Sequence, residues 1–561
     1  MAVGNNSVKT VAHWLMFLAL VTFYIGAYAP FGLENNDGGF MLGLSFQVFK
    51  GSHLYSDVLY VRPPLSPLLH EFVFFWPFSG APVLADRVFF YAQIATSSLF
   101  SSLVVRRLLG WGLPQVVAVA AMGFMLSAHA FPAMGWHTVD GIFFFTLSLY
   151  ALLVGLNRRY GVLILSAGFA IGAAACKQPF YIVPPLILVL AVILRGGSVV
   201  FSVLLASMAV MLGLMWAWLH IGGVTHIFWE SITSQTSLQD LLQAGVLDYL
   251  HDMSGPRISF VVLPLSIGLV VSALDLGSRR FQAGALLFAG WLILLMVGRH
   301  YWRADSWSQP FPVFDSVFVV TLVCSLLMAW TRRDAGWGVI VGMHSVAWAA
   351  SISWGNQTSA LYAVPSAIVV GHFLGGAARD MCQVRWMGLA MLPLGLAVFF
   401  VGNQYAYSLE GAVRRSSNVE DMGSLSPSLH YIRATTHQRA LYSDFLDLRG
   451  RFSGAPFVVM PNMPLAHMLV NEVNPIGVDW VLNVEIGKRA NDVLDRLRNR
   501  VGYAFVRKHA IPAPQAAGKF GSDVSIFVMR HWMLINETPE FLVYKNPHFT
   551  AGKELLLQTE P

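Results

Sequence analysis

The sequence predicts an α-helical polytopic membrane protein with a small soluble α/β domain at its C-terminal end. Hydrophobic residues make up 56% of the 561 residues and charged residues only 12%, and the mean hydropathy is +0.59. A soluble core could not bury that much apolar surface. Successive apolar runs are long enough to cross a bilayer, which takes about 17–25 residues per helix. Beyond residue 403 the apolar runs shorten, and charged and turn-forming residues become frequent.

The first apolar run, residues 11–31, is predicted to be a retained transmembrane helix. It shows no small-residue cleavage pattern before a soluble domain, which a removed signal peptide would need. Further runs bring the expected number of transmembrane helices to about 13. We therefore expect a transmembrane domain over residues 1–403 and a soluble domain over 404–561. The further runs span residues 84–105, 113–131, 141–156, 161–178, 180–194, 198–219, 257–276, 281–298, 312–330, 335–352, 361–378 and 386–403.

Basic residues gather at alternate ends of these runs, and the positive-inside rule places such ends in the cytoplasm. Lys9 puts the N-terminus inside, and an odd number of crossings then puts residues 404–561 outside. The short, arginine-flanked loops favour a bacterial inner membrane, with the C-terminal domain periplasmic or extracellular. The other basic residues of the inner side are Arg106, Arg107, Arg158, Arg159, Arg195, Arg279, Arg280, Arg332, Arg333, Arg379 and Arg385.

The outer face is the expected side for chemistry. The positive-inside rule places the segments 32–83, 132–140, 220–256, 299–311 and 353–360 on this face. Of the 15 acidic residues before residue 404, only Asp275, Asp334 and Asp380 fall on the cytoplasmic side. The charge rule does not require this distribution, because Asp and Glu have little influence on insertion. A working surface on the outer face would explain it.

Charge and cysteine content exclude several classes of protein. The formal net charge of +6 is explained by membrane topology, so a nucleic-acid partner is not implied. Cys176, Cys324 and Cys382 lie in or beside apolar runs without metal-ligand spacing. Neither a disulfide framework nor a zinc site is therefore predicted.

The tail is predicted to form a small open sheet, because strand-like and helix-like segments alternate in it. Strands are expected at 456–461, 502–506, 525–529 and 541–544, and an amphipathic helix at 491–500. The tail contains no glycine-rich phosphate loop. A rigid cap that shapes an acceptor site is one interpretation of it.

The outer segment 32–83 holds the most informative residue, Asp37, directly after the first apolar run. A carboxylate at the mouth of a membrane helix is costly unless it is paired or functional. The same segment contains a short apolar piece at 67–78, too short to span, which is expected to lie in the membrane interface.

Three stretches of sequence resemble a known family. The acidic loop is followed by Phe49–Asp57 (FKGSHLYSD) and Val61–Leu65 (VRPPL), which are similar to the first outer loop of the GT-C glycosyltransferases. His137–Phe145 resembles that family's second acidic position, which opens a helix, and Gly172–Phe180 resembles its Gly-x(4)-Lys-x(2)-Phe segment. The subgroup most similar to this chain includes the protein mannosyltransferases and the lipid A aminoarabinose transferases. The recognisable motifs lie within about residues 10–200.

The resemblance implies an enzyme that transfers a sugar from a polyprenyl-phosphate donor. Such a donor carries its own leaving group, so the protein must hold the phosphate, deprotonate an acceptor hydroxyl and exclude water. Asp37 is the candidate base, since partial desolvation would raise the pKa of its carboxyl toward a useful range. A turn carboxylate beside Gly38 and Gly39 is the structural alternative. Glu34 could support Asp37 or help to bind a divalent ion, but two carboxylates alone do not make a metal site, so none is assigned.

Other candidates are basic or polar residues of the outer face. The donor phosphate would suit Lys177 first, then Arg303, Arg299, Arg62 and His53, because arginine binds phosphate bidentately and lysine as a point charge. For each of them a snorkelling or acid-paired side chain is the alternative. Asp57, His137 and Asp140 are candidates for sugar or acceptor binding, and His137 could also donate to the phosphate.

The resulting hypothesis is an inverting glycosyltransferase that moves one monosaccharide to a glycan, lipid or protein acceptor on the outer face. The first alternative is a polytopic lipid or solute transporter, which would show pseudo-symmetric halves and interrupted helices at mid-membrane. The second is an outer-face polysaccharide polymerase that uses diphosphate-linked donors. The polymerase would share the predicted topology, so the two functions are distinguished only by whether the enzyme uses a monophosphate or a diphosphate donor.

Overall fold

A computed structural model describes residues 2–33, 39–233, 242–254, 274, 311–352, 359–382, 415–510 and 521–549. The chain divides into two compact units. The first comprises Met1–Ala29, Val88–Met215 and Ser237–Arg415, and the second comprises Pro30–Arg87, Trp216–Thr236 and Ser416–Pro561. The outer loop predicted at 32–83 therefore groups with the C-terminal region and not with the helices that flank it.

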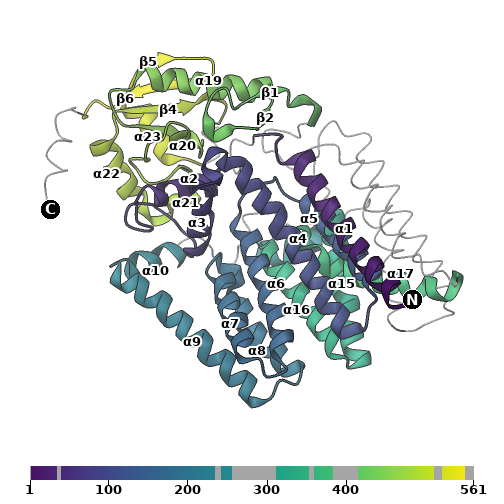
Figure 1. Ribbon diagram of the computed structural model, residues 1–561. Coiled ribbons are helices and arrows are strands. Elements are labelled where there is room, and N and C mark those ends of the chain that lie inside the picture. The colour runs from purple at the N-terminus through teal and green to yellow at the C-terminus, as the bar shows by residue number, and fades with distance from the viewer. Residues whose placement is uncertain are drawn as a thin grey trace. The chain divides into compact units, whose positions relative to one another are not determined.

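All regular elements that the structure describes in the first unit are helices (Figure 1). Two helices, α4 and α9, begin or end in the second unit. The elements are α1 (Ala2–Tyr28), α4 (Pro82–Leu109), α5 (Leu113–Ala128), α6 (His137–Gly155), α7 (Tyr160–Ala174), η3 (Gln178–Ile182), α8 (Val183–Ile193), α9 (Ser198–Ile221), η4 (Gln243–Leu247), α12 (Asp248–Ser254), α15 (Phe311–Arg332), α16 (Ala335–Ser351), η5 (Ser359–Tyr362) and α17 (Val364–Cys382).

Four of the described helices are long and apolar enough to cross a membrane: α1, α4, α6 and α9. Large apolar side chains of α9, among them Leu205, Val210 and Leu214, are exposed, as side chains that face lipid would be. These helices support the predicted membrane protein. Every predicted span among the described residues coincides with a helix. Apart from residue 274, the spans 257–276, 281–298 and 386–403 lie outside the described residues, so the count of 13 stays a prediction.

Close helix contacts fix the position of α6. Ser148 of α6 and Ser166 of α7 exchange hydrogen bonds, each hydroxyl donating to the other's backbone carbonyl at 2.7 and 2.8 Å. Small residues allow such an approach in membrane helices, and a Cβ added at Gly155 would lie 2.5 Å from Leu163. In Figure 1, α6, α7 and α8 run side by side. The chain between α7 and α8 therefore returns to the N-terminal end of α6.

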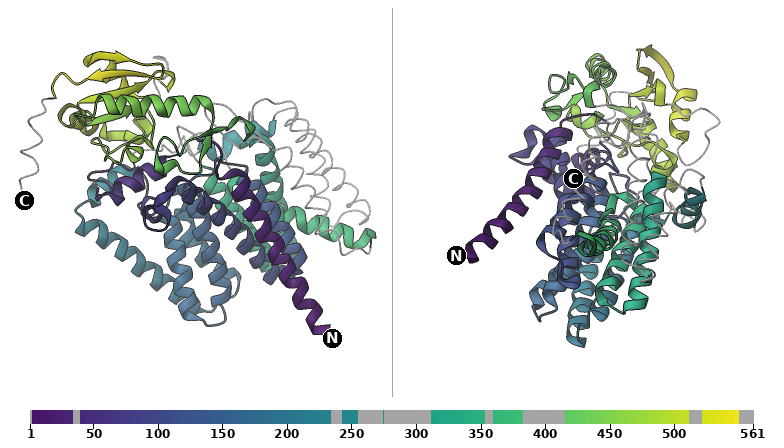
Figure 2. Two further views of the ribbon diagram at one scale, coloured as in Figure 1. Left: turned by 45° about the horizontal axis from the view of Figure 1, so that its top comes forward. Right: turned by 90° about the vertical axis from the view of Figure 1, so that its right-hand side faces the viewer.

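The second unit contains a four-stranded sheet in the order β3-β4-β6-β5. Strand β3 (Phe457–Met460) pairs parallel with β4 (Tyr503–Arg507), whereas β6 (Phe541–Lys545) runs antiparallel to both β4 and β5 (Met533–Glu537). Helix α19 (Thr436–Arg451) packs on one face of the sheet, as Figure 2 shows in its left view. Helices α22 (Ala490–Arg500) and α23 (Asp523–His531) pack on the other face. The predicted small α/β domain is therefore present as a three-layer arrangement.

The outer loop contributes to the core of this unit. Helix α2 (Phe40–Phe49) is buried from Phe40 to Gln47, and its Leu42 and Phe46 pack in one cluster with Leu465 next to α20 (Ala466–Leu469). An apolar helix without a polar face is expected to be buried in this way. The loop also contains α3 (Leu65–His70), η1 (Glu71–Phe74) and η2 (Phe78–Gly80), and α10 (Thr225–Thr233) completes the unit together with β1 (Glu420–Asp421), β2 (Arg433–Ala434) and α21 (Asn483–Ile486).

One predicted strand is wrong. Residues 525–529 lie within helix α23, because Ser522 caps its N-terminus by accepting from the Ser525 backbone N–H at 3.2 Å. Val524 and Val528 are buried with helical spacing. The strand that follows, β5, was not predicted. Its side chains are mostly exposed, so its sequence lacks the alternation of buried and exposed residues that predicts a strand. The strands expected at 456–461, 502–506 and 541–544 and the helix at 491–500 are confirmed.

Candidate functional site

The structure describes six of the ten predicted site residues. Arg62, His53 and Asp57 belong to the second unit, and His137, Asp140 and Lys177 belong to the first. Glu34, Asp37, Arg299 and Arg303 lie outside the described residues.

Lys177 lies at the meeting point of the two motifs in the first unit. It precedes η3 in an extended conformation, and its Nζ donates to Thr138 Oγ1 of α6 at 3.1 Å. Both side chains are buried, as is His137 at the first position of α6. A lysine is rarely buried unless its charge has polar partners. The segments Gly172–Phe180 and His137–Phe145, recognised separately in the sequence, thus form one buried polar cluster.

Asp140 is held by a residue that sequence reasoning missed. Gln93 of α4 donates from Nε2 to Asp140 Oδ1 at 2.7 Å, and both side chains are fully buried. Asp140 lies in the first turn of α6, where the helix dipole favours a negative charge. One residue further on, a Cβ at Gly141 would lie 2.2 Å from the Phe180 ring. Glycine is therefore required for α6 to approach η3 this closely.

Polar side chains follow Gln93 on the same face of α4, toward the C-terminal end of the helix. Ser97 and Ser101 follow at intervals of four residues, and Ser101 Oγ lies 2.6 Å from Tyr362 Oη. Ser97 and Ser98 line a small cavity together with Ser127 and Tyr362. Polar side chains inside membrane helices are expensive and often functional. The sequence signal that could have revealed these side chains is the Gln93, Ser97, Ser101 spacing within an otherwise apolar run.

In the second unit, the turn at Tyr55–Asp57 is fixed by two arginines. Tyr55 is buried with a positive φ of 74°. Arg489 donates to the Tyr55 carbonyl at 2.7 Å, and Arg496 donates to the Ser56 and Asp57 carbonyls, each at 2.6 Å. Burial, and after it the nearby positive charges of Arg489 and Arg500, lowers the pKa of Arg496. The Asp57 carboxylate itself accepts from the His53 backbone N–H at 2.8 Å, so it caps its own turn.

Arg62 forms a buried bidentate ion pair with Glu485 of α21. Its Nη1 and Nη2 lie 2.9 and 2.7 Å from the two carboxylate oxygens, and only 3% of each side chain is exposed. The guanidinium also lies 5.3 Å from the centre of the Phe40 ring. The charge of Arg62 is therefore balanced within the protein, and its predicted role toward a phosphate stays a prediction.

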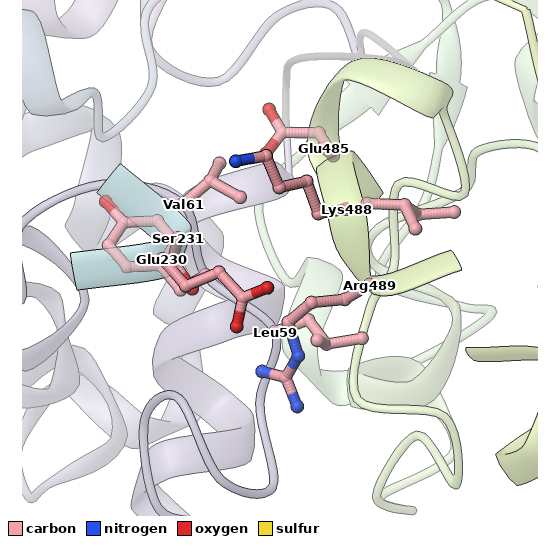
Figure 3. A pocket seen from close by; sticks show the side chains of 9 residues that line it. Leu59, Val61, Glu230, Ser231, Glu485, Lys488 and Arg489 are labelled. Atoms are coloured by element: carbon pink, nitrogen blue, oxygen red, sulfur yellow. The ribbon is translucent and has the colours of Figure 1, made fainter. Parts of the chain in front are cut away.

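A pocket adjoins this ion pair, as Figure 3 shows. Its charged lining residues are Glu230 of α10, Glu485, Lys488 and Arg489. The ends of the Glu230 and Arg489 side chains lie on the same side of the pocket in Figure 3. Sequence reasoning missed Glu230, Lys488 and Arg489, because no local pattern distinguishes them from surface charges.

Metal binding has no support among the described residues, which contain no group of three or more His, Cys, Asp or Glu side chains placed to hold an ion. Glu34 and Asp37 lie outside these residues. The sequence-based expectation of no assigned metal, with a divalent cation as the alternative, therefore stays untested.

Comparisons with known proteins find structural neighbours only. No family model and no curated protein matches the chain. The match to an oligosaccharyltransferase from Archaeoglobus fulgidus, solved with Zn and sulfate, spans 92% of this chain and 70% of that chain, with a TM-score of 0.47 and 12% identity. The match to AglB from the same organism, solved with an inhibitory peptide and a dolichol-phosphate, spans 89% of this chain and 70% of that chain, with a TM-score of 0.47 and 12% identity. The match to ArnT from Cupriavidus metallidurans spans 97% of this chain and 98% of that chain, with a TM-score of 0.45 and 11% identity.

TM-scores below 0.5 at such low identity do not transfer a substrate, a metal or the role of any residue to this chain.

Proposed function

We propose that the protein is a membrane glycosyltransferase that moves a monosaccharide from a polyprenyl-phosphate donor to an acceptor at the outer face of the membrane. The observation that carries the proposal is the bond between Lys177 and Thr138. It joins the two motif segments that resemble the GT-C enzymes, and His137 and Asp140 of the second segment are buried as well.

In the proposed reaction, Lys177 and His137 stabilise the donor phosphate, since a lysine acts toward it as a point charge. Asp140, oriented by Gln93, binds sugar hydroxyls. Arg62, Arg299, Arg303 and His53 remain candidates for further phosphate contacts, and Asp57 and Glu34 for contacts with the acceptor or sugar.

Asp37 is the proposed base. The acceptor oxygen forms a bond to the anomeric carbon while the bond from that carbon to the phosphate oxygen breaks. The electron pair leaves with the polyprenyl phosphate, and the acceptor proton passes to the Asp37 carboxylate. A single displacement of this kind inverts the anomeric configuration. No step is assigned to a metal ion.

The localisation follows from the charge distribution of the sequence. A bacterial inner membrane with the N-terminus in the cytoplasm would place the acidic loop and the C-terminal domain on the periplasmic or extracellular side. The acceptor, whether a glycan, a lipid or a protein, would be presented there.

The test uses the purified full-length protein with a radiolabelled polyprenyl-phosphate sugar. Asp37→Asn should abolish transfer and preserve donor binding, whereas Lys177→Met should weaken donor binding. Lys545→Met, an exposed lysine on β6, serves as the matched control and should change neither. Retained turnover in Asp37→Asn would contradict the assignment of the base.

A second donor distinguishes the polymerase. Turnover with a polyprenyl-diphosphate sugar, and none with the monophosphate, would replace the proposal with a diphosphate-dependent enzyme. Turnover with neither donor, at full binding of both, would favour a transporter of the lipid.

A further inference from the structure

Two neighbouring serines in the middle of α4 are buried. Ser97 and Ser98 are 3% and 1% exposed, and neither hydroxyl forms a hydrogen bond with the residues that the structure describes. A buried polar group without a partner costs free energy, and nearly all such groups in folded proteins are bonded to the protein or to an ordered water. The two hydroxyls therefore need a partner beyond the described side chains and backbone.

A third serine of the same helix shows the usual alternative. Ser102 donates from Oγ to the Ser98 carbonyl at 2.9 Å. A bond to the carbonyl four residues earlier is a common way for a helical serine to satisfy its hydroxyl. Ser97 and Ser98 do not form this bond. Both of them line a cavity instead.

The cavity lies within the first unit, between α4, α5, α6 and η5. Its volume is about 10 Å³, and one buried water molecule needs about 10–15 Å³ of such space. The cavity therefore has room for a single water and not for a larger ligand. None of the described residues that line it is charged, so an ion would be buried there without a counter-charge, which is costly.

Ser127 of α5 supplies a third hydroxyl to the cavity. Its side chain is fully buried, and its Oγ accepts from the Ala363 backbone N–H at 3.1 Å. A serine hydroxyl has one donor and two acceptor positions, so Ser127 can form a further hydrogen bond. Three hydroxyls from two helices meet the requirement of a buried water, which typically has two to four polar partners.

We propose that this cavity is a binding site for one ordered water molecule, held by the hydroxyls of Ser97, Ser98 and Ser127. The water connects α4 with α5 and, through the bond between Ser127 and Ala363, with the beginning of α17. Such a bridge is nearly as favourable in enthalpy as a direct hydrogen bond. The site goes beyond the proposed glycosyl transfer and does not depend on it.

The cavity adjoins the turn of α6 that carries Asp140. Val139 and Ile142, on either side of Asp140, belong to its lining. On α4, Gln93 donates to Asp140 and lies four residues before Ser97. The water site therefore lies in the same packing contact between α4 and α6 that brings Gln93 to Asp140.

The direct test is a structure of the purified full-length wild-type protein at about 2 Å resolution. It should show one ordered water within about 3.0 Å of both the Ser97 and the Ser98 Oγ. A cavity without a water peak would overturn the proposal. So would hydroxyls turned to the carbonyls four residues before them.

Thermal unfolding of Ser97→Ala, Ser98→Ala and the double variant gives a second test. Ser102→Ala is the matched control on the same helix, because its hydroxyl bonds to the backbone and alanine favours a helix over serine equally in all the single variants. Both Ser97→Ala and Ser98→Ala should melt below Ser102→Ala, because each removes a partner of the water. The double variant should lose less than the sum of the two single losses, since both act on one water.

The direction of the shift decides between a hydrated and a dry cavity. Removing a buried hydroxyl that has no partner is neutral or stabilising. Melting of Ser97→Ala and Ser98→Ala at or above that of Ser102→Ala would therefore overturn the water site. Strictly additive losses in the double variant would overturn the sharing of one water by the two serines.

Discussion

The guanidinium of Arg62 and the carboxylate of Glu485 form a bidentate ion pair, and only 3% of each side chain is exposed. They are separated by 423 residues in the sequence. Removing one member of a buried ion pair leaves an unpaired buried charge, which typically costs about 3–5 kcal/mol. We therefore expect Arg62→Met and Glu485→Leu each to lower the free energy of unfolding by that amount, as measured by thermal or denaturant unfolding of the purified protein.

The double variant Arg62→Met/Glu485→Leu separates the structural role of Arg62 from a role toward the donor phosphate. Since neither charge is then left unpaired, its stability should lie closer to the wild type than that of either single variant. If the pair is structural, the double variant should also keep the donor KM. A raised donor KM in a stable double variant would support the predicted phosphate contact instead.

The bond between Lys177 and Thr138 gives a prediction for donor binding. Thr138→Val keeps the shape of the side chain and removes the acceptor of the lysine's hydrogen bond. Hydrogen bonds to charged groups contribute about 1.5–3 kcal/mol, and about 1.4 kcal/mol corresponds to a tenfold change in affinity. The dissociation constant for a polyprenyl-phosphate sugar, measured by titration of the purified protein, should rise, because the Lys177 ammonium is no longer oriented by Thr138.

Thr146→Val is the matched control for this measurement. Thr146 lies on the same helix and is also fully buried, with its hydroxyl bonded to the Ile142 carbonyl at 2.7 Å. It should lose stability and keep donor affinity. Unchanged affinity in both Thr138→Val and Lys177→Met would show that the cluster does not bind the donor.

The helices were predictable from the sequence because an apolar run of membrane-spanning length fixes both the type and the approximate ends of an element. Lys177 and Asp140 could be proposed as site residues from the sequence because they lie in motif segments, and their role stays a prediction. Their partners were less accessible: Gln93 is one polar residue among several in α4, and its relation to Asp140 depends on how two helices pack. The partner of Arg62 depends on contacts between the outer loop and the C-terminal region. No local pattern encodes such contacts.

Short elements of the C-terminal region show the same limit. Ser525–Met529 is a short run rich in apolar residues, as a buried strand would be, but the cap at Ser522 and the packing of Val524 and Val528 favour a helix. Periodicity over five residues cannot decide between the two, whereas tertiary packing can. Strand β5 is stabilised by its pairing with β6 and not by burial of an apolar face.

Arg496 is expected to stabilise the turn at Tyr55–Asp57. It donates to two backbone carbonyls of this turn, and Tyr55 has a left-handed conformation that a non-glycine residue rarely adopts. Arg496→Met should therefore raise the rate of proteolytic cleavage and of amide hydrogen exchange within residues 53–58. Arg498→Met is the control on the same helix, because the Arg498 side chain is exposed, pairs with the exposed Asp495 and lies over the Phe527 ring. Equal exchange rates in the two variants would contradict the expected role of Arg496.

The contact between Gly141 and Phe180 tests whether the approach of α6 to η3 matters for the site. In Gly141→Ala the added Cβ would lie 2.2 Å from the Phe180 ring, so one of the two segments must move. Overpacking of this kind costs about 1–3 kcal/mol, and a shift of η3 would also displace Lys177. We expect a lower melting temperature together with weaker donor binding, and Phe180→Leu should restore part of both because it removes the clashing ring. Gly168→Ala in α7 is the control, since its added Cβ would have only Met211 nearby, at 4.0 Å, and alanine favours a helix over glycine. If Gly141→Ala keeps full stability and affinity while Gly168→Ala does the same, the close approach of α6 to η3 does not position Lys177.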